Sequence, residues 1–109
     1  MAEYSIGLRL SSTLLERIHQ HCLLSNESRN KWLLRAARMM LKRGYPIRAK
    51  TTARELLIGK QPITFRVDPL TLELIDEACD EDDLTRTVWI MDAILSRLAK
   101  QPISKLRQK

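Results

Sequence analysis

The chain has 109 residues, of which 44% are hydrophobic and 29% charged, and its formal net charge is +6 at pH 7. This composition is typical of one small folded domain, and no apolar run reaches the roughly 18 residues that a membrane span needs. The excess of positive charge favours an anionic partner, whereas Cys22 and Cys79 are too few for a disulfide scaffold or a four-cysteine zinc site.

The first predicted element is a strand over residues 6–10, where apolar side chains alternate with other residues. A helix is then expected to start at Ser11-Ser12 and to end in the polar patch Ser25-Asn26. The apolar residues that recur at helical spacing, and that are predicted to face the core, are Leu14, Ile18 and Cys22.

A second helix is expected to follow at once, with Ser28 as its N-cap and Gly44 at its end. Its predicted core residues are Trp32, Leu33, Ala36, Ala37, Met40 and Leu41. The helical register directs Trp32 toward this core rather than toward the surface, where an aromatic ring could stack on a nucleic-acid base. A basic linker over residues 44–62 comes next, and residues 52–59 within it are expected to form two helical turns.

Residues 63–100 repeat residues 6–43 without a gap at a shift of 57 positions. Ten of the 38 aligned positions are identical, and both tryptophans and both cysteines are in register. The second copy predicts a strand over residues 63–67, a helix from Asp68-Pro69 to Asp82-Asp83, and a last helix capped by Thr85. Its predicted core residues are Leu72, Ile75, Cys79, Trp89, Ile90, Ala93, Ile94 and Leu98.

The chain is thus divided into a first unit at 1–43, a basic linker at 44–62, a second unit at 63–100 and a basic tail at 101–109. A strand-helix-helix unit of about 38 residues buries too little surface to fold alone, and a single strand needs a partner for its backbone groups. We therefore expect the two strands to pair antiparallel and the helices to share one core. The predicted fold is mainly α with a short two-stranded antiparallel ribbon, and the two units form one folded domain.

This order of elements resembles the ribbon-helix-helix superfamily of MetJ/Arc-type repressors over 76 of the 109 residues. The stretch Leu84-Thr85-Arg86-Thr87 is close to the family's Leu-Ser-Arg/Lys-Ser signal before the second helix, whereas the first unit has Glu27 where an apolar residue is usual. Most members are homodimers of one unit, so a tandem chain implies an intramolecular pseudo-dimer. In this form the chain is similar to conjugation accessory proteins of the TraY type.

The resemblance implies that the ribbon enters the major groove of double-stranded DNA and that outward side chains contact base edges. By position, these residues are Ser5, Gly7, Arg9, Pro62, Thr64 and Arg66. Arginine can donate two hydrogen bonds to guanine, whereas Gly7 and Pro62 have no polar reach. Because the two strands differ, we expect an asymmetric binding site on the DNA.

The starts of the two second helices are expected to bind phosphate, because their backbone N–H groups are free and the helix dipole is positive there. The residues predicted at these contacts are Ser28, Arg29, Asn30, Lys31, Thr85, Arg86 and Thr87. Further salt-sensitive affinity is expected from Arg35, Arg48, Lys50, Lys105, Arg107 and Lys109.

The sequence therefore predicts a sequence-specific DNA-binding protein that acts as a transcriptional repressor or as a conjugation accessory protein. We expect it in the cytoplasm of a bacterium, with a bacterial, phage or plasmid origin. No set of nucleophile, base and orienting residue stands out, so no enzyme activity and no cofactor are expected. A metal site at His19, His21 and Cys22 is not expected, because residues two apart lie on different helix faces and the second unit has no matching ligands.

The acidic second unit, with nine acidic and four basic side chains, favours a rival function as a protein-interaction module, such as an inhibitor or adaptor. Most of its carboxylates fall in residues 76–83 and are expected to face away from the DNA. They would attract either a basic protein or the basic first unit of a second copy on an adjacent site. Leu23 and Leu24 occupy the positions at which the second unit has Asp80 and Glu81. Two alternatives for what covers these leucines stay open, namely residues 56–58 of the linker and a protein partner.

Overall fold

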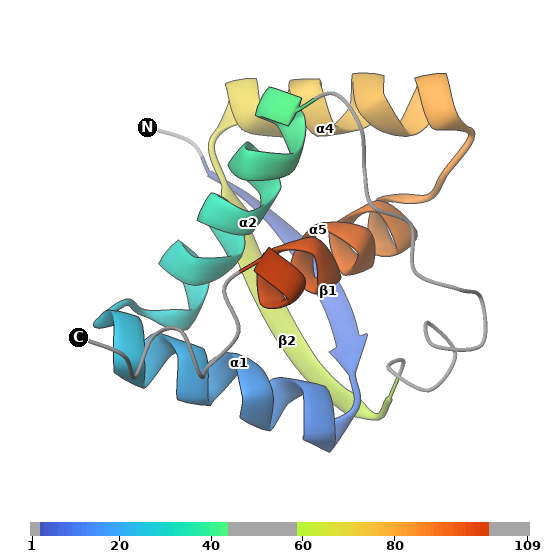
Figure 1. Cartoon of the computed structure of the whole chain (residues 1–109). Coiled ribbons are helices and arrows are strands. Elements are labelled where there is room, and N and C mark those ends of the chain that lie inside the picture. Colours follow the sequence, from blue (N-terminus) through green and yellow to red (C-terminus); the bar gives the residue numbers. More distant parts are fainter. Residues whose placement is uncertain (1–2, 44–58, 101–109) are drawn as a thin grey trace.

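The computed structural model describes residues 3–43 and 59–100, which Figure 1 shows in sequence colours. The elements in chain order are β1 (Tyr4–Leu10), α1 (Ser12–Ser25), α2 (Arg29–Arg43), β2 (Gln61–Val67), α4 (Pro69–Asp82) and α5 (Arg86–Lys100). The described chain is mainly helical with a two-stranded antiparallel sheet, which confirms the predicted fold class at this level. The helical turns predicted over residues 52–59 lie outside the described residues, apart from Gly59.

The two strands pair antiparallel along their whole length, with Gly7 opposite Thr64 at the centre. Because these two residues are also equivalent in the repeat, the pairing on either side is reciprocal: Ser5 lies opposite Arg66, and Arg9 lies opposite Pro62. Each strand begins two residues earlier than predicted. Residues 61–62 therefore belong to β2 and not to the linker, which corrects the predicted boundary.

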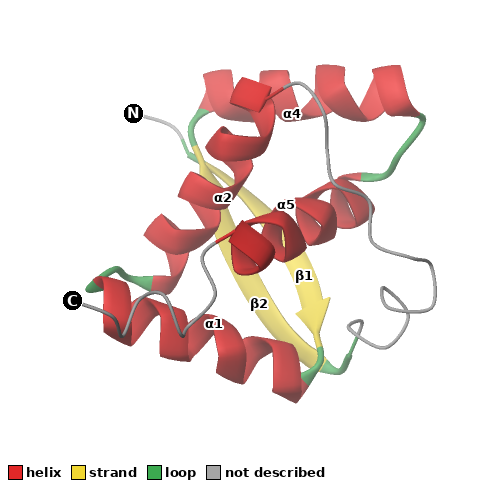
Figure 2. Cartoon of the chain, viewed as in Figure 1, coloured by secondary structure: helices red, strands yellow, loops and turns green. Residues whose placement is uncertain are grey.

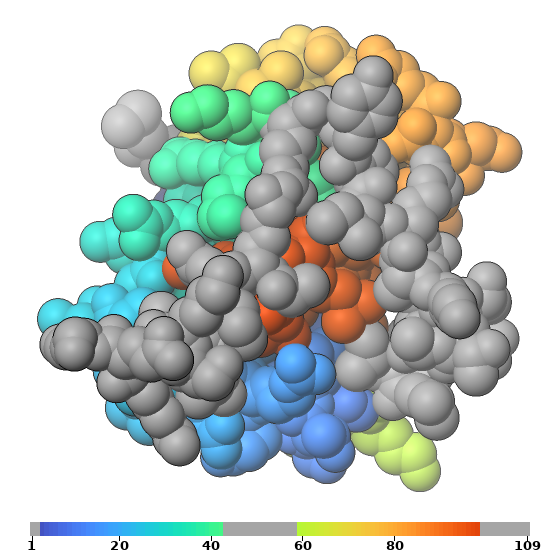
Figure 3. Space-filling model, viewed as in Figure 1, coloured from blue at the N-terminus to red at the C-terminus, as the bar shows by residue number. Residues whose placement is uncertain are grey.

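Strict alternation along the ribbon separates an apolar face from an exposed face. The inward side chains are at most 6% exposed: Ile6, Leu8, Leu10, Ile63, Phe65 and Val67. Figure 2 shows α2 and α5 crossing one face of the ribbon, with α1 and α4 at its two ends. In the space-filling view from this side, the strands are almost entirely hidden except near the start of β2 (Figure 3). The helices therefore cover the apolar face and leave the polar face open.

The predicted helix starts are confirmed by their capping hydrogen bonds. Ser11 Oγ accepts from the Leu14 N–H at 3.1 Å, and an Asp68 carboxylate oxygen accepts from the Thr71 N–H at 3.1 Å. At the starts of α2 and α5, Ser28 and Thr85 likewise accept from the N–H groups three residues on. A side-chain oxygen is favoured at these positions because it satisfies an N–H that has no partner within the helix.

The ends of α1 and α4 are also where the sequence predicts them. Asn26 and Asp83 adopt left-handed backbone conformations, with φ of 56° and 54°. Short polar side chains tolerate this conformation better than other residues besides glycine, and it lets the chain turn sharply into the next helix. After these turns α2 begins at Arg29 and α5 begins at Arg86, which are equivalent residues of the repeat.

The predicted core is largely confirmed, with both tryptophans at most 1% exposed and both free cysteines buried. Leu72 is a correction, because it is only partly buried. Thr71 takes the buried position, since it is the repeat equivalent of Leu14 and lies four residues before the buried Ile75. Its hydroxyl is satisfied by donating to the capping Asp68 at 2.6 Å. Leu41 is likewise only partly buried. The sequence did not predict the buried polar side chains His21, Asp92, Ser96 and Arg97.

Among the helices of residues 3–43 and 59–100, none combines the length and the apolar character needed to cross a membrane.

Candidate nucleic-acid interface

The outward face of the ribbon consists of the six residues that were predicted to contact bases. All of them are exposed: Ser5, Gly7, Arg9, Pro62, Thr64 and Arg66. The strand register places Arg66 beside Ser5 at one end of the ribbon and Arg9 beside Pro62 at the other. Among the described residues, neither of these two guanidinium groups forms an ion pair. Both are therefore available to an anionic or hydrogen-bonding ligand.

The start of α2 is attached directly to the ribbon by the side chain of Asn30. The Arg66 N–H donates to Asn30 Oδ1 at 2.7 Å, and Asn30 Nδ2 donates to the Arg66 carbonyl oxygen at 3.2 Å. This pair of hydrogen bonds satisfies backbone groups of β2 and fixes the position of the α2 start beside Arg66. The Asn30 carboxamide thus has a structural partner, a role that the sequence did not predict.

The start of α5 lies beside the other end of the ribbon. Thr87, which is equivalent to Asn30 in the repeat, lines a shallow hollow together with Arg9, Pro62 and Thr64. Asn30 at the α2 start and Thr87 at the α5 start therefore lie beside the two ends of the ribbon, next to residues predicted to contact bases.

The two helix starts differ in charge, because Arg86 at the α5 start is held by Asp76 of α4. Arg86 Nε and Nη2 donate to the two carboxylate oxygens of Asp76 at 2.7 and 2.8 Å. These hydrogen bonds lower the pKa of Asp76 and raise the pKa of Arg86. The ion pair neutralises the guanidinium that the sequence assigned to phosphate, and Asp76 does not face away from the predicted site.

In the first half of the chain (the first unit, residues 1–43), the positions equivalent to this ion pair carry no neutralising carboxylate. His19 replaces Asp76 in the repeat, and it lines a hollow together with Arg29, the equivalent of Arg86. Arg29 forms no ion pair within the described part of the chain. Lys31 is exposed, and its equivalent in the second half is Val88. The α2 start is consequently the more cationic of the two.

The hydroxyls of Ser28 and Thr85 lie at the tips of these helices, where each accepts a backbone N–H at 3.2 or 3.3 Å. Arg35, predicted to add affinity, contacts Glu27 at 3.2 Å. The other predicted cations lie outside the described residues: Arg48, Lys50, Lys105, Arg107 and Lys109.

His21 is buried and its ring contacts the Trp32 ring edge-on, with centroids 5.6 Å apart. Burial lowers the pKa of His21, and the nearby cations Arg97 and Arg17 lower it further. The imidazole is therefore neutral near pH 7. Within residues 3–43 and 59–100, no group of three or more His, Cys, Asp or Glu side chains is arranged to hold a metal ion.

Comparisons of the chain with protein-family models, with curated protein sequences and with solved structures give no match.

Proposed function

We propose that the chain is two fused ribbon-helix-helix units, an intramolecular pseudo-dimer, that binds double-stranded DNA sequence-specifically. The strand pairing centred on Gly7 and Thr64 supports the pseudo-dimer, because it relates each half to the other through the repeat. The observation that carries the DNA-binding proposal is the exposed ribbon face, which bears two guanidinium groups and is bordered by two helix starts.

Arg9 and Arg66 are the principal base-contacting residues in this proposal. Four residue positions separate them along the ribbon, which corresponds to about 13 Å at the rise of an antiparallel strand. Base pairs follow one another at about 3.4 Å, so the two side chains match guanines about four base pairs apart. Each bidentate contact to guanine O6 and N7 is worth about 1–3 kcal/mol of discrimination.

The remaining residues of the ribbon make its two ends chemically different. Ser5 and Thr64 supply hydroxyls that can bond a base edge, whereas Gly7 and Pro62 supply none. The charge difference between the helix starts acts in the same direction, since Arg29 and Lys31 are available for phosphate while Arg86 is neutralised. The preferred DNA site is therefore asymmetric, with the stronger phosphate contacts on the α2 side.

A protein of this kind acts by occupying its site, without catalysis and without a cofactor. We propose a role as a transcriptional repressor or a conjugation accessory protein in the bacterial cytoplasm, of bacterial, phage or plasmid origin. A second copy on an adjacent DNA site belongs to the same proposal.

Selection of duplexes from a randomised pool tests the base contacts. The double variant Arg9→Ala/Arg66→Ala should lose at least about 30-fold in affinity for the selected duplex and much less for random duplexes. Lys42→Ala serves as the matched control, because this exposed cation lies near the opposite end of α2 from its start and should leave the discrimination unchanged. An equal loss on selected and random duplexes would refute base contact by the two arginines.

The second candidate function is binding of a basic protein, and the exposed face of α4 favours it. Leu70 and Leu74 are 64% and 41% exposed there, on the helix that also carries the exposed carboxylates Glu73, Glu77 and Asp80. Salt dependence separates the two functions, because phosphate contacts weaken steeply as salt rises. Absence of duplex binding at low salt, together with a tight protein partner, would favour the second function.

A further inference from the structure

A buried ion pair joins the two halves of the chain. Arg97 of α5 donates to a carboxylate oxygen of Glu27, in the turn between α1 and α2, at 2.7 Å, and both side chains are at most 5% exposed. The same guanidinium donates to the Trp32 carbonyl at 2.8 Å, and its central carbon lies 4.7 Å from the centroid of the Trp32 ring. Burial opposes ionisation of Glu27, but the hydrogen bond and charge of Arg97, together with the hydrogen bond from Arg35, outweigh it and lower the pKa.

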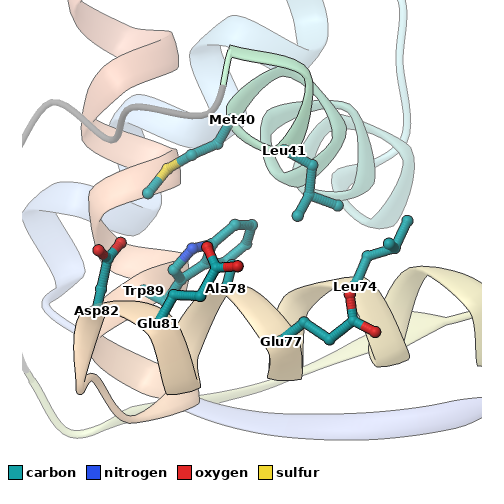
Figure 4. A pocket seen from close by; sticks show the side chains of 8 residues that line it. All are labelled: Met40, Leu41, Leu74, Glu77, Ala78, Glu81, Asp82 and Trp89. Carbon is teal, nitrogen blue, oxygen red and sulfur yellow. The ribbon is translucent and has the colours of Figure 1, made fainter.

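The equivalent positions in the other half carry apolar residues. The shift of 57 residues relates Glu27 to Leu84 and Arg97 to Met40. Met40 is 4% exposed and Leu84 is partly buried against the core. Figure 4 shows Met40 beside Trp89, in the hollow that both residues line, just as Arg97 lies over the equivalent Trp32. The chain thus has an ion pair on one side and two apolar residues at the equivalent positions on the other.

This difference penalises pairing between identical halves. If the first half paired with the first half of a second copy in the same register, each Glu27 would face a methionine, Met40, in place of Arg97. If two second halves paired, each Arg97 would face Leu84, and a guanidinium cannot lose its proton to escape burial as an ion. Separating a buried ion pair is strongly destabilising, whereas replacing both partners with apolar residues is often neutral.

We propose that the Glu27–Arg97 ion pair is a pairing-specificity element, which makes the N-terminal half select the C-terminal half and reject its own counterpart in a second copy. A buried polar contact that is satisfied in only one arrangement specifies that arrangement, as polar residues do in coiled coils. The inference concerns how the chain pairs with itself and does not depend on DNA binding. Its consequence is that the ribbon always contains one strand of each kind.

A cysteine at position 7 detects pairing between identical halves. In the native register Gly7 lies opposite Thr64, whereas in pairing between two first halves it would lie opposite Gly7 of the second copy. Directly opposed residues of antiparallel strands have Cα atoms about 4.5–5.5 Å apart, which is within the range for a disulfide. A Cβ at Gly7 meets nothing within 4 Å, so Gly7→Cys should fold.

The experiment refolds the full chain from denaturant, oxidises it after refolding, and measures the covalent dimer on a non-reducing gel. The native thiols of Cys22 and Cys79 are buried and burial raises their pKa, so the introduced thiol is the reactive one. Gly7→Cys is compared in three backgrounds: the otherwise unchanged chain, Glu27→Leu/Arg97→Met, and Met40→Arg/Leu84→Glu. The second background makes both contacts apolar and the third makes both ionic, so each removes the difference between the halves.

We expect covalent dimer to be a minor product in the unchanged background and to rise at least about tenfold in either altered background that folds, since about 1.4 kcal/mol of lost discrimination corresponds to a factor of ten. A disulfide within the chain of Gly7→Cys/Thr64→Cys verifies native pairing in each background. Abundant covalent dimer in the unchanged background, beyond that of the exposed variant Ser5→Cys, which would lie opposite Arg9 of a second copy and so dimerises only by collision, overturns the proposal whether or not the altered chains fold. An equally low dimer fraction in a folded altered background overturns it as well.

Discussion

Replacing Asp76 with asparagine tests whether an acidic side chain suppresses phosphate binding at the start of α5. Asp76 holds Arg86 through hydrogen bonds of 2.7 and 2.8 Å, and asparagine removes the charge while keeping the size. The two side chains are 43% and 47% exposed, so loss of this ion pair should cost less than about 1 kcal/mol of stability. The variant should therefore fold, with the Arg86 guanidinium released toward a bound phosphate.

The size of the effect follows from counterion release. One additional phosphate contact steepens the dependence of log affinity on log salt by about 0.9, which corresponds to roughly fivefold tighter binding at about 0.15 M salt. Fluorescence anisotropy of a labelled random duplex, titrated between about 50 and 200 mM salt, measures both quantities. We expect Asp76→Asn to show the steeper slope and the higher affinity.

Two matched variants decide whether Arg86 is the cause. Glu77→Gln removes the same charge from the neighbouring position of α4, where no contact with Arg86 is found among the described residues, and it should leave the slope unchanged. Asp76→Asn/Arg86→Ala should lose the gain that Asp76→Asn produces. An equal gain from Glu77→Gln, or a gain that persists without the guanidinium, would refute the reasoning.

Three further outcomes are expected. Arg29→Ala and Lys31→Ala should each flatten the salt slope by about 0.9 in the same titration, and an unchanged slope would remove the α2 start from the DNA contact. The folded state lowers the pKa of His21, so the unfolded chain binds more protons than the folded chain as the pH falls below about 6.5. The contribution of neutral His21 to the free energy of unfolding is therefore complete above that pH and is lost below it. Thermal unfolding between about pH 7.5 and 5 should show this loss in the unchanged chain and not in His21→Gln, and equal pH dependence would contradict the assignment. Gly59→Ala should lower the melting temperature because its Cβ would collide with the backbone just after β1, whereas Gly7→Ala should not; equal melting temperatures would argue against that close approach.

The parts of the structure that the sequence predicted are those set by local patterns. Alternation of apolar residues predicted which faces of β1 and β2 are buried, and side-chain oxygens at Ser11, Ser28, Asp68 and Thr85 predicted the helix starts. The exposed positions of the residues predicted to contact bases also followed from that alternation. Their contact with DNA stays a prediction.

The sequence did not predict the partnerships between side chains of different elements. Three such contacts depend on how the helices pack: the hydrogen bonds between Asn30 and β2, the ion pair between Asp76 and Arg86, and the ion pair between Glu27 and Arg97. Local propensity and periodicity carry no information on such contacts. A signal was nevertheless present in the repeat, because each of these ion pairs includes positions where the two halves differ in charge.

Backbone amide shifts of the isotopically labelled protein, followed by NMR while a selected duplex is added, map the DNA contact residue by residue. Binding through the ribbon predicts the largest shifts at Gly7, Arg9, Thr64 and Arg66, with further shifts in the first turn of α2. Shifts confined to α4, or no shifts at low salt, would show that the exposed face of the ribbon is not a DNA-binding surface.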